Sequence, residues 1–425
     1  MSSRLPRSQP RSADGAGPVS RRDLLEIYLA GIRAADGRAR VADDLAGREP
    51  PARPVRLIAV GKSAPAMARG ALEAWAPHIV GGIVITRHGY RDPALDGRAG
   101  LSQLESGHPV PDETSLAAGQ ALRDHVLAAD PAEQILFLIS GGASSLVEVL
   151  PEGVSLADLR RVSDWLLGSG LDIAAVNAVR RGLSTIKDGR LAHLCAERAI
   201  LALYVSDVAG DAPWDIGSGL LSQAPARPLP PELPPWVARL LESGPPRSPA
   251  SVERVEHRIV ASLETALAGC EAAAAARGYA VHPHPGRLDL DVAAAAATIV
   301  DGLGQGGPGI HLWGGETTVR LPAEPGRGGR NQHLALACAI SLAGDREAML
   351  LCGATDGSDG PGEDAGALID GGSLERAAAE GYVATDCLAR ADAGRCLEAA
   401  GDLISTGPTG TNVNDLVIGL TRCGG

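Results

Sequence analysis

The chain is poor in aromatic side chains and in long apolar runs. Aromatic residues make up 3% of its 425 residues, and Phe137 is the single phenylalanine. The core must therefore be built from Ala, Leu, Val and Ile, and the hydrophobic content of 45% suits a folded chain of two or three domains. No apolar run reaches the length of a membrane span, so we expect no membrane partner.

The chain also lacks cysteine pairs and a surplus of positive charge. Its seven cysteines are scattered and form no CxxC pair, which argues against a disulfide framework or a zinc site. A net charge of −12 does not provide the basic surface that a nucleic-acid partner requires. Residues 1–20 contain no apolar stretch typical of a signal peptide, and we interpret them as a disordered tail. These features predict a cytoplasmic protein with reduced thiols and no nucleic-acid partner.

Short apolar runs alternate with helical patterns in the first half of the chain. Strands are predicted at 55–60, 82–86, 134–139 and 201–205, and helices at 64–75 and 114–128. This alternation predicts an α/β fold whose mainly parallel sheet is covered on both faces.

The composition changes at the proline-rich residues 223–249, which exclude a long helix and a central strand. An alanine-rich helix is predicted over 258–277. Further strands are predicted at 309–314, 317–321, 348–352 and 416–420. The second half therefore contains another α/β region.

Glycine-rich segments follow several predicted strands, where open α/β sheets place their ligand crevice. Gly61-Lys62-Ser63 puts a lysine at the start of a predicted helix, where backbone N–H groups and the helix dipole favour an anion. The segment lacks the spacing of a Walker A loop. Two interpretations stay open for Lys62: a phosphate-binding residue, or a solvent-exposed lysine after a strand.

Two further segments of the first half are suited to phosphate chemistry. Ser140-Gly141-Gly142 allows close backbone approach and, with Ser144, forms an anion nest or else a tight turn. Asp207 and Asp211 follow a strand, where they are suited to magnesium or to a general base, or else to helix capping.

In the second half, Glu316 follows two glycines after a strand, and residues 326–332 form a glycine-rich loop with Arg327 and Arg330. Such a loop is either a phosphate-covering loop, in which one of the arginines neutralises charge, or a surface hairpin. No GxGxxG segment follows a strand with an acid downstream, so the dinucleotide fingerprint is absent.

Eight short motifs, taken in order, resemble the glycerate 2-kinase family, the two-domain kinases with a C-terminal MOFRL domain. The resemblance extends from about Asp23 to Leu420. The motifs are VGKSA at 60–64, GHPVPDE at 107–113, SGG at 140–142, SDVAGD at 206–211, GGETTV at 314–319, GGRNQ at 328–332, TDGSDGP at 355–361 and TGTNVND at 409–415.

The resemblance implies a Rossmann-like three-layer domain with a mainly parallel sheet over residues 21–285, and a smaller α/β domain of MOFRL type over 286–425. It places the proline-rich excursion 223–249 in the first of these domains. It implies an ATP-dependent kinase that phosphorylates D-glycerate at the 2-hydroxyl to give 2-phosphoglycerate, with Mg²⁺ as the cation. It leaves a homodimer open.

The resemblance also assigns roles to individual residues. Lys62, Arg330 and Asp207 are expected to be catalytic, with Asp207 and Asp211 as the candidates for holding the metal. The residues expected to bind substrate or phosphate are Ser140, Gly141, Gly142, Ser144, Lys187 and Glu316.

Three departures from the family pattern, Ala143, Gly182 and Leu220, leave the hydroxy-acid substrate open. One alternative is an NAD(P)H-dependent hydroxypyruvate reductase, against which the missing dinucleotide fingerprint argues. Another is a non-catalytic ligand-binding protein, against which the presence of both Lys62 and Arg330 argues.

Overall fold

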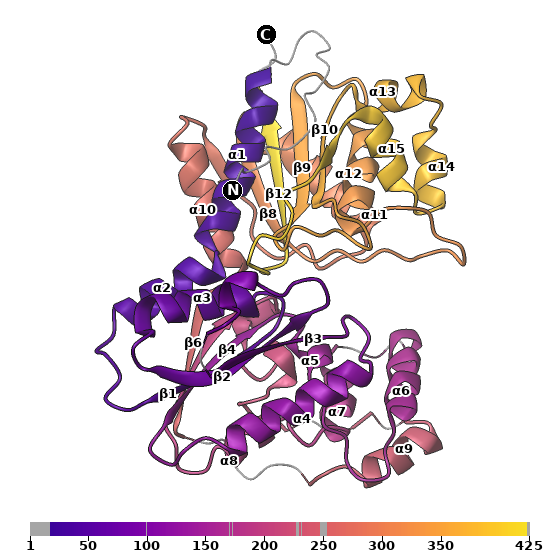
Figure 1. Ribbon diagram of the computed structural model, residues 1–425. Coiled ribbons are helices and arrows are strands. Elements are labelled where there is room, and N and C mark those ends of the chain that lie inside the picture. The colour runs from indigo at the N-terminus through magenta and orange to yellow at the C-terminus, as the bar shows by residue number, and fades with distance from the viewer. Residues whose placement is uncertain are drawn as a thin grey trace. The chain divides into compact units, whose positions relative to one another are not determined.

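The chain divides into two compact units, each with its own sheet (Figure 1). The computed structural model describes residues 18–98, 100–169, 171, 173–226, 229–230, 232–246 and 253–422. The N-terminal unit consists of residues 36–262 and 410–412, and the C-terminal unit of residues 1–35, 263–409 and 413–425. Among the described residues, no helix has both the length and the apolar character needed to cross a membrane.

The N-terminal unit is built on a six-stranded parallel sheet with the strand order β3-β2-β1-β4-β5-β6. Its inner strands are almost continuously buried, as expected of a parallel sheet covered on both faces. The strands are β1 (Val55–Val60), β2 (Ile79–Arg87), β3 (Leu101–Ser106), β4 (Gln134–Ser140), β5 (Ile200–Val205) and β6 (Val255–Ala261). The predicted α/β fold with a parallel sheet is confirmed.

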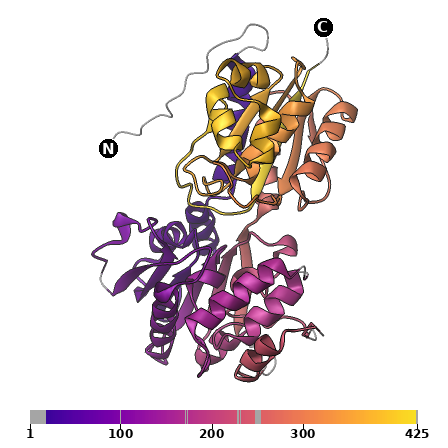
Figure 2. The ribbon, with the colours of Figure 1, turned by 90° about the vertical axis from the view of Figure 1, so that its right-hand side faces the viewer.

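Helices cover both faces of this sheet, as the two views of Figures 1 and 2 show. One face carries α2 (Gly37–Ala46) and α3 (Ala64–Trp75); the other carries α4 (Glu113–Leu127), α5 (Ala143–Leu146) and α8 (Arg190–Leu194). A smaller apolar cluster joins α6 (Leu156–Gly168), α7 (Ile173–Gly182) and α9 (Pro235–Glu242). The short helix α9 lies within the proline-rich segment and begins at Pro235, a position where proline is compatible with a helix.

The C-terminal unit contains a mixed six-stranded sheet with the order β11-β10-β9-β12-β8-β7. β12 runs antiparallel to β8 and β9, whereas β7 is parallel to β8. The strands are β7 (Val281–Pro283), β8 (Gly309–Gly315), β9 (Ala348–Ala354), β10 (Gly366–Asp370), β11 (Leu403–Ile404) and β12 (Asp415–Thr421). The predicted strands at 309–314, 348–352 and 416–420 are therefore confirmed.

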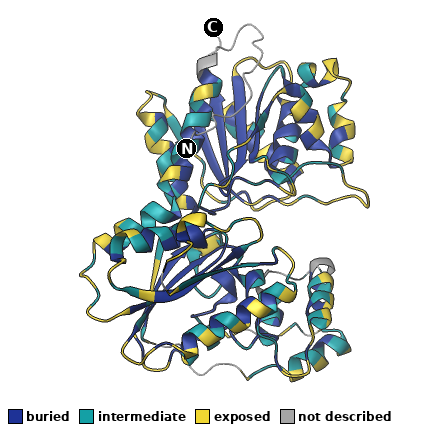
Figure 3. Cartoon of the chain, in the orientation of Figure 1, coloured by how far each residue is buried: buried dark blue, intermediate teal, exposed yellow. Residues whose placement is uncertain are grey.

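Helices also cover both faces of the second sheet. On one side lie α1 (Pro18–Ala34) and α10 (Leu263–Ala275). On the other lie α11 (Val292–Gln305), α12 (Arg330–Ser341), α13 (Ser373–Ala379), α14 (Ala384–Ala389) and α15 (Ala393–Ala400). In both units the central strands are largely buried, while the outward helix faces are exposed (Figure 3).

The boundary between the compact units differs from the expected division at residue 285. Helix α1 packs on α10 and on the second sheet, where the Tyr28 hydroxyl donates a hydrogen bond of 2.5 Å to the carbonyl oxygen of Ala354. The Cys270 side chain lies against Gly31 across the same pair of helices. Residues 21–35 and 263–285 therefore belong to the C-terminal unit, since their apolar faces are buried there.

Two predicted elements are wrong. The helix predicted over 258–277 begins only at Leu263, because residues up to Ala261 form the edge strand β6, whose polar side chains face solvent. The strand predicted over 317–321 does not form. A single bridge pairs Thr318 with Asp291, and the largely exposed segment runs directly into Pro322.

Candidate active site

The centre of the parallel sheet is the point where the direction of chain progression reverses. β1 lies between β2 and β4, and the chain builds outward through β2 and β3 before it returns to β4 on the other side of β1. In open α/β sheets, ligands bind beyond the carboxyl ends of the strands at such a switch point. The loops that leave β1 and β4 there are the glycine-rich segments 61–63 and 140–142.

Backbone contacts lock these two loops together. The N–H of Lys62 donates to the carbonyl oxygen of Gly141 at 2.9 Å, and the N–H of Ser63 donates to the hydroxyl oxygen of Ser140 at 3.0 Å. Gly61 has a φ of +136°, and a Cβ atom there would lie 2.1 Å from Oγ of Ser140. Only glycine permits this approach. Ser140 is buried, and its hydroxyl oxygen holds the Lys62 loop by accepting the N–H of Ser63.

Three side chains from different loops converge on Gly141 and Gly142. A Cβ atom on Gly141 would lie 1.8 Å from Oδ2 of Asp207. One on Gly142, where φ is +82°, would lie 3.1 Å from Cε1 of His108 and 3.3 Å from Cγ of Lys62. The structure therefore brings Lys62 and Asp207 together with the glycine loop.

Asp207 is held by a residue from far along the chain. Nδ2 of Asn412 donates to Oδ2 of Asp207 at 2.9 Å, and Asn412 belongs to the segment 410–412 that packs with the N-terminal unit. Asp211 follows after Gly210 and is half-buried. Sequence reasoning missed Asn412, because the TGTNVND motif was recognised without a role for any of its members.

Asp207 and Asp211 are the carboxylates that the sequence predicted as metal ligands. Within the part of the chain that the structure describes, no group of three or more His, Cys, Asp or Glu side chains is placed to hold a metal ion. Mg²⁺ usually retains several waters and binds through one or two carboxylates plus substrate phosphates. That Asp207 and Asp211 hold a metal therefore stays a prediction.

His108 is a second residue that sequence reasoning missed. Its Nδ1 lies 2.7 Å from Oγ of Ser145, and its Cε1 would lie 3.1 Å from a Cβ atom on Gly142. The GHPVPDE motif contained it, but the motif was recognised without a role for this histidine. The structure places it at the same glycine as Lys62.

Ser144 and Lys187, both expected to bind substrate or phosphate, are engaged within the protein. Oγ of Ser144 lies 2.7 Å from Oγ of Ser218, at the end of the short 3₁₀ turn Ile216–Ser218. The Lys187 ammonium donates to the carbonyl oxygen of Ser144 at 2.7 Å and to Oε2 of Glu148 at 2.6 Å. Because Lys187 is buried in this pair, the geometry does not favour the expected direct contact with a substrate.

In the C-terminal unit, Arg330 is the first residue of α12 and binds two carboxylates. Its Nε and Nη2 donate to the two oxygens of Asp415 at 2.6 and 3.1 Å, and Nη1 lies 2.8 Å from Oε1 of Glu316. Burial alone would lower the pKa of the Arg330 guanidinium, but the charges and hydrogen bonds of Asp415 and Glu316 more than offset it and raise the pKa. The fork with the buried Asp415 fixes the guanidinium plane.

The partner on the other edge of Arg330, Glu316, is exposed. Its Oε2 accepts a hydrogen bond of 3.0 Å from Nδ2 of Asn414. The Glu316 carboxylate therefore faces a cation of the protein, and its expected contact with substrate or phosphate stays a prediction. The other arginine of the loop, Arg327, is bound to Asp364 and Glu398 and takes no part in this cluster.

The N-terminus of α12 is capped by a buried carboxylate. Asp359 accepts the N–H groups of Asn331 at 3.0 Å and of Gln332 at 2.8 Å. Burial raises the pKa of Asp359 to about 7, and the nearby Asp415 adds to this, while the two N–H groups and Arg330 act in the opposite direction. This helix start therefore already has its anion.

The stability of the C-terminal unit is expected to fall as the pH rises from about 4 to about 7. The folded pKa of Asp359, about 7, lies above its ordinary value of 3.8, so the native state retains the proton longer than the unfolded chain. The protonated Asp359 carboxyl contributes its full stabilisation below the pKa of the unfolded chain, 3.8. This contribution is lost as the pH rises through the pKa of the folded state, about 7. Asp359→Asn should remove a pH dependence on the order of 2 kcal/mol.

Urea denaturation at pH 5 and pH 8 measures this effect. The stability of the wild type relative to Asp359→Asn should be lower at pH 8 than at pH 5. Asp386→Asn, which changes an exposed carboxylate on α14, is the matched control and should follow the wild-type profile. Parallel profiles for Asp359→Asn and the wild type would contradict the assignment.

The three departures from the family pattern have internal packing explanations. The methyl group of Ala143 faces Gly217, where a Cβ atom would approach it to 3.2 Å. A Cβ atom on Gly182 would lie 2.6 Å from Cδ2 of Leu241, so the glycine accommodates helix α9. Leu220 is buried in the main core of the unit.

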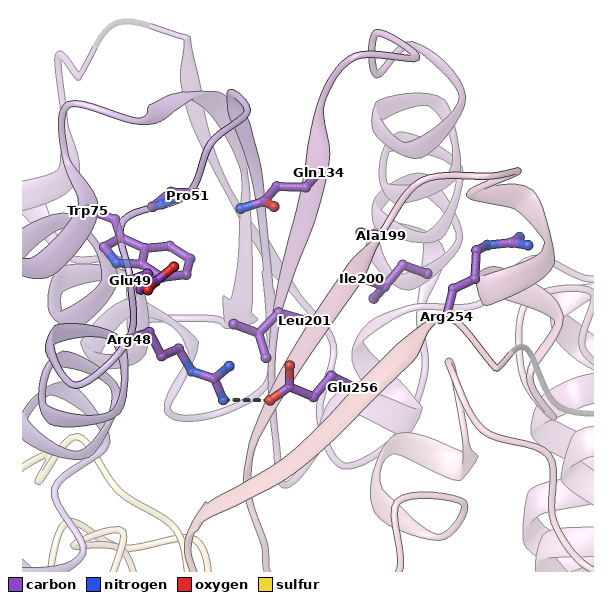
Figure 4. A pocket seen from close by; sticks show the side chains of 10 residues that line it. All are labelled: Arg48, Glu49, Pro51, Trp75, Gln134, Ala199, Ile200, Leu201, Arg254 and Glu256. Atoms are coloured by element: carbon purple, nitrogen blue, oxygen red, sulfur yellow. Dashed lines mark hydrogen bonds and ion pairs between the residues drawn. The ribbon is translucent and has the colours of Figure 1, made fainter.

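A hollow of about 470 Å³ lies at the opposite ends of the strands, at the amino ends of β4, β5 and β6 (Figure 4). Its Arg48 is paired with Asp44 and Glu256, and Arg254 is paired with Glu197. Carboxylates already neutralise the charge of both arginines. Ligands of open α/β sheets bind beyond the carboxyl ends of the strands. We therefore place the candidate active site at the carboxyl ends.

Comparison with known proteins gives a consistent result. Residues 23–228 match the family described as domain of unknown function DUF4147, and residues 309–415 match the MOFRL family. The D-glycerate 2-kinase of Thermotoga maritima is 35% identical over 395 residues, which cover 86% of this chain and 90% of that protein. A protein of Agrobacterium vitis that bears the name hydroxypyruvate reductase is 38% identical over 85% of this chain and 97% of its own length. The crystal structure of a glycerate kinase from Thermotoga maritima superposes with a TM-score of 0.82 at 31% identity, covering 96% of this chain and all of that one.

Proposed function

The chain belongs to the glycerate 2-kinase family, and we propose on that basis that it transfers the γ-phosphoryl group of ATP to the 2-hydroxyl of D-glycerate, giving 2-phosphoglycerate and ADP. The observation that carries this proposal is Lys62. It stands at the switch point of the parallel sheet, at the start of the twelve-residue helix α3, in a loop locked to Gly141. Such a position places a cation at the positive end of the α3 helix dipole, which suits phosphate.

The proposed roles follow from the demands of phosphoryl transfer, which are positioning and charge neutralisation. Lys62 binds the phosphate oxygens and neutralises the charge that develops on them. Gly141 and Gly142 lack side chains, which leaves room for Asp207, His108 and Lys62 to converge beside the proposed phosphate site. The buried Ser140 supports this loop through Ser63.

Asp207 is the proposed base or metal ligand. As the base, its carboxylate accepts the proton of the 2-hydroxyl while the hydroxyl oxygen bonds to the γ-phosphorus and the bond from that phosphorus to the leaving oxygen of ADP breaks. As a metal ligand, it acts with Asp211. These two residues would hold Mg²⁺, which would supply charge neutralisation at the phosphate oxygens. Asn412 orients the carboxylate in either role.

In the C-terminal unit, we assign Arg330 to charge neutralisation during phosphoryl transfer. We assign Glu316 to holding the edge of the guanidinium that Asp415 does not bind. Asp415 holds one edge of the guanidinium, so only the edge at Glu316 is able to exchange a carboxylate for a phosphate or substrate oxygen.

Phosphoryl transfer is tested directly with ATP, Mg²⁺ and a panel of small hydroxy acids, with the phosphorylated position located by phosphorus NMR. We expect D-glycerate to give the 2-phosphate. Turnover of another acid only would keep the kinase chemistry and change the substrate, whereas no turnover of any acid would contradict the proposal. Light scattering of the same sample measures whether the chain forms a homodimer, which stays a prediction.

A reductase is the second candidate, because of the name carried by the Agrobacterium vitis relative. The loop after β1 reads Gly61-Lys62-Ser63 and lacks the three spaced glycines with which a dinucleotide pyrophosphate is bound. We expect ATP, and not NADH, to raise the thermal unfolding temperature. Oxidation of NADH in the presence of hydroxypyruvate would favour the reductase.

A further inference from the structure

Lysine is almost absent from this chain. Lys62 and Lys187 are the only two lysines among its 39 basic residues, and all the others are arginines. Lysine offers a compact charge with three donors, whereas arginine offers a larger planar fork. The first lysine lies in the candidate active site, and the second lies in the interior of the same unit.

Lys187 and Glu148 form a fully enclosed ion pair. Their side chains are 3% and 2% exposed, and the nitrogen–oxygen distance is 2.6 Å. The second oxygen of Glu148 accepts the N–H of Val149 at 3.0 Å. Burying two charges costs several kcal/mol of desolvation, so such a pair is weak evidence for a purely stabilising role.

The third partner of this pair is the carbonyl oxygen of Ser144, which otherwise has no helical donor. In a longer helix it would accept the N–H of residue 148, but the N–H of Glu148 donates instead to the carbonyl oxygen of Ser115 at 3.1 Å. Helix α5 has only four residues, so its last carbonyls need outside donors. The Lys187 ammonium supplies one at 2.7 Å.

The turn that Lys187 holds also carries the two serine hydroxyls of the glycine loop. Oγ of Ser144 contacts Oγ of Ser218 at 2.7 Å, and Oγ of Ser145 lies 2.7 Å from Nδ1 of His108. Ser145 also donates to the carbonyl oxygen of Gly142 at 3.1 Å. A shift of this turn would therefore move the loop beside Lys62.

We propose that Lys187 and Glu148 are positioning residues, which fix the Ser144–Ser145 turn so that the glycine loop receives phosphate in one geometry. Neither residue touches the substrate. The inference rests on the proposed kinase function. It explains the use of lysine at 187, since one compact ammonium serves two acceptors, Glu148 and Ser144, in an enclosed space.

The test compares single and double replacements. Lys187→Met leaves a buried carboxylate without its cation, and the unfolding temperature should drop by roughly 10 °C. Lys187→Met combined with Glu148→Leu removes both charges, and the unfolding temperature should recover most of that loss. In both variants kcat/KM should remain about 100-fold below the wild type, because the Ser144 carbonyl has lost its donor.

Arg56 and Glu133 are the matched control pair. They form an ion pair at the amino ends of the central strands β1 and β4 of the same sheet, and their side chains are 21% and 9% exposed. Arg56→Met combined with Glu133→Leu is expected to change the unfolding temperature and to leave kcat/KM within about threefold. If the Lys187 and Glu148 double variant recovers both stability and kcat/KM, the pair is only structural and the inference fails.

Amide exchange of the wild type gives a second, independent readout. Residues 143–149 should exchange slowly without any ligand, and fast exchange would overturn the inference even where the variants do not fold. Turnover by the wild type reports on the proposed function separately. If the wild type has no turnover, that proposal fails, and the affinity for ATP measured by calorimetry replaces kcat/KM as the readout for the variants.

Discussion

Lys62→Met is expected to lower kcat for phosphoryl transfer by about 10³-fold and to change the unfolding temperature by less than about 2 °C. Methionine keeps an unbranched side chain but removes the charge that neutralises the phosphate oxygens. The loop itself should persist, because the N–H groups of Lys62 and Ser63 bind it to Gly141 and Ser140, and the replacement leaves these hydrogen bonds in place. The measurement is steady-state turnover of ATP with D-glycerate, together with calorimetry.

The matched control for Lys62 is Arg239→Met, which removes an exposed cation from α9 and should leave kcat unchanged. Lys62→Arg tests whether a charge alone suffices, and we expect it to recover less than about a tenth of the activity, since a planar fork does not replace a compact ammonium. A Lys62→Met enzyme with wild-type kcat would remove this residue from the mechanism, and with it the main support for the placement of the active site.

Arg330→Lys is the second replacement with a large expected effect, a loss of about 10³-fold in kcat/KM. A lysine cannot satisfy both oxygens of Asp415 and still present a donor on the edge at Glu316, as the guanidinium does. Steady-state kinetics with varied ATP and varied D-glycerate measure the loss and separate binding from turnover.

Arg327→Met is the contrasting variant in the same loop. The Arg327 guanidinium is bound to Asp364 and Glu398, so we expect kcat/KM of this variant to change by less than about threefold. Arg330→Ala offers a further check, because the carboxylates of Asp415 and Glu316 remain and should capture free guanidinium, which restores part of the activity at millimolar concentration. Equal losses in the Arg327 and Arg330 variants would show that the loop as a whole, and not the Arg330 fork, matters.

The parts of the site that depend on neighbouring residues were predictable from the sequence. A strand at 55–60, the turn at Gly61 and a helix from residue 64 are local features, and the structure has all of them. The switch point follows from strand order, which a run of alternating elements does not determine. The order 3-2-1-4 was needed to place the loops of β1 and β4 side by side.

The contacts that the sequence could not reveal join distant segments. Asn412 meets Asp207 across 205 residues, and Tyr28 meets Ala354 across 326 residues. An amphipathic helix such as α1 shows that one face is buried, but not which sheet buries it. The boundary expected at residue 285 differed from the structure for this reason.

Other differences arise where one pattern fits two structures. The apolar residues Ile259 to Ala261 suit a helix or an edge strand, and hydrogen bonding to β5 selects the strand. The resemblance assigned Lys187 to substrate or phosphate binding. Its burial and its two internal acceptors are visible only in three dimensions.

The scarcity of lysine makes the folded chain a simple substrate for a lysine-specific endoprotease. Only two bonds, after Lys62 and after Lys187, are cleavable, so digestion produces a small set of fragments. The bond after Lys187 lies in the interior of the N-terminal unit, and its cleavage requires that the core around Ile186 opens. The rate at which the 188–425 fragment appears therefore reports the opening of that core, with no label or mutation introduced.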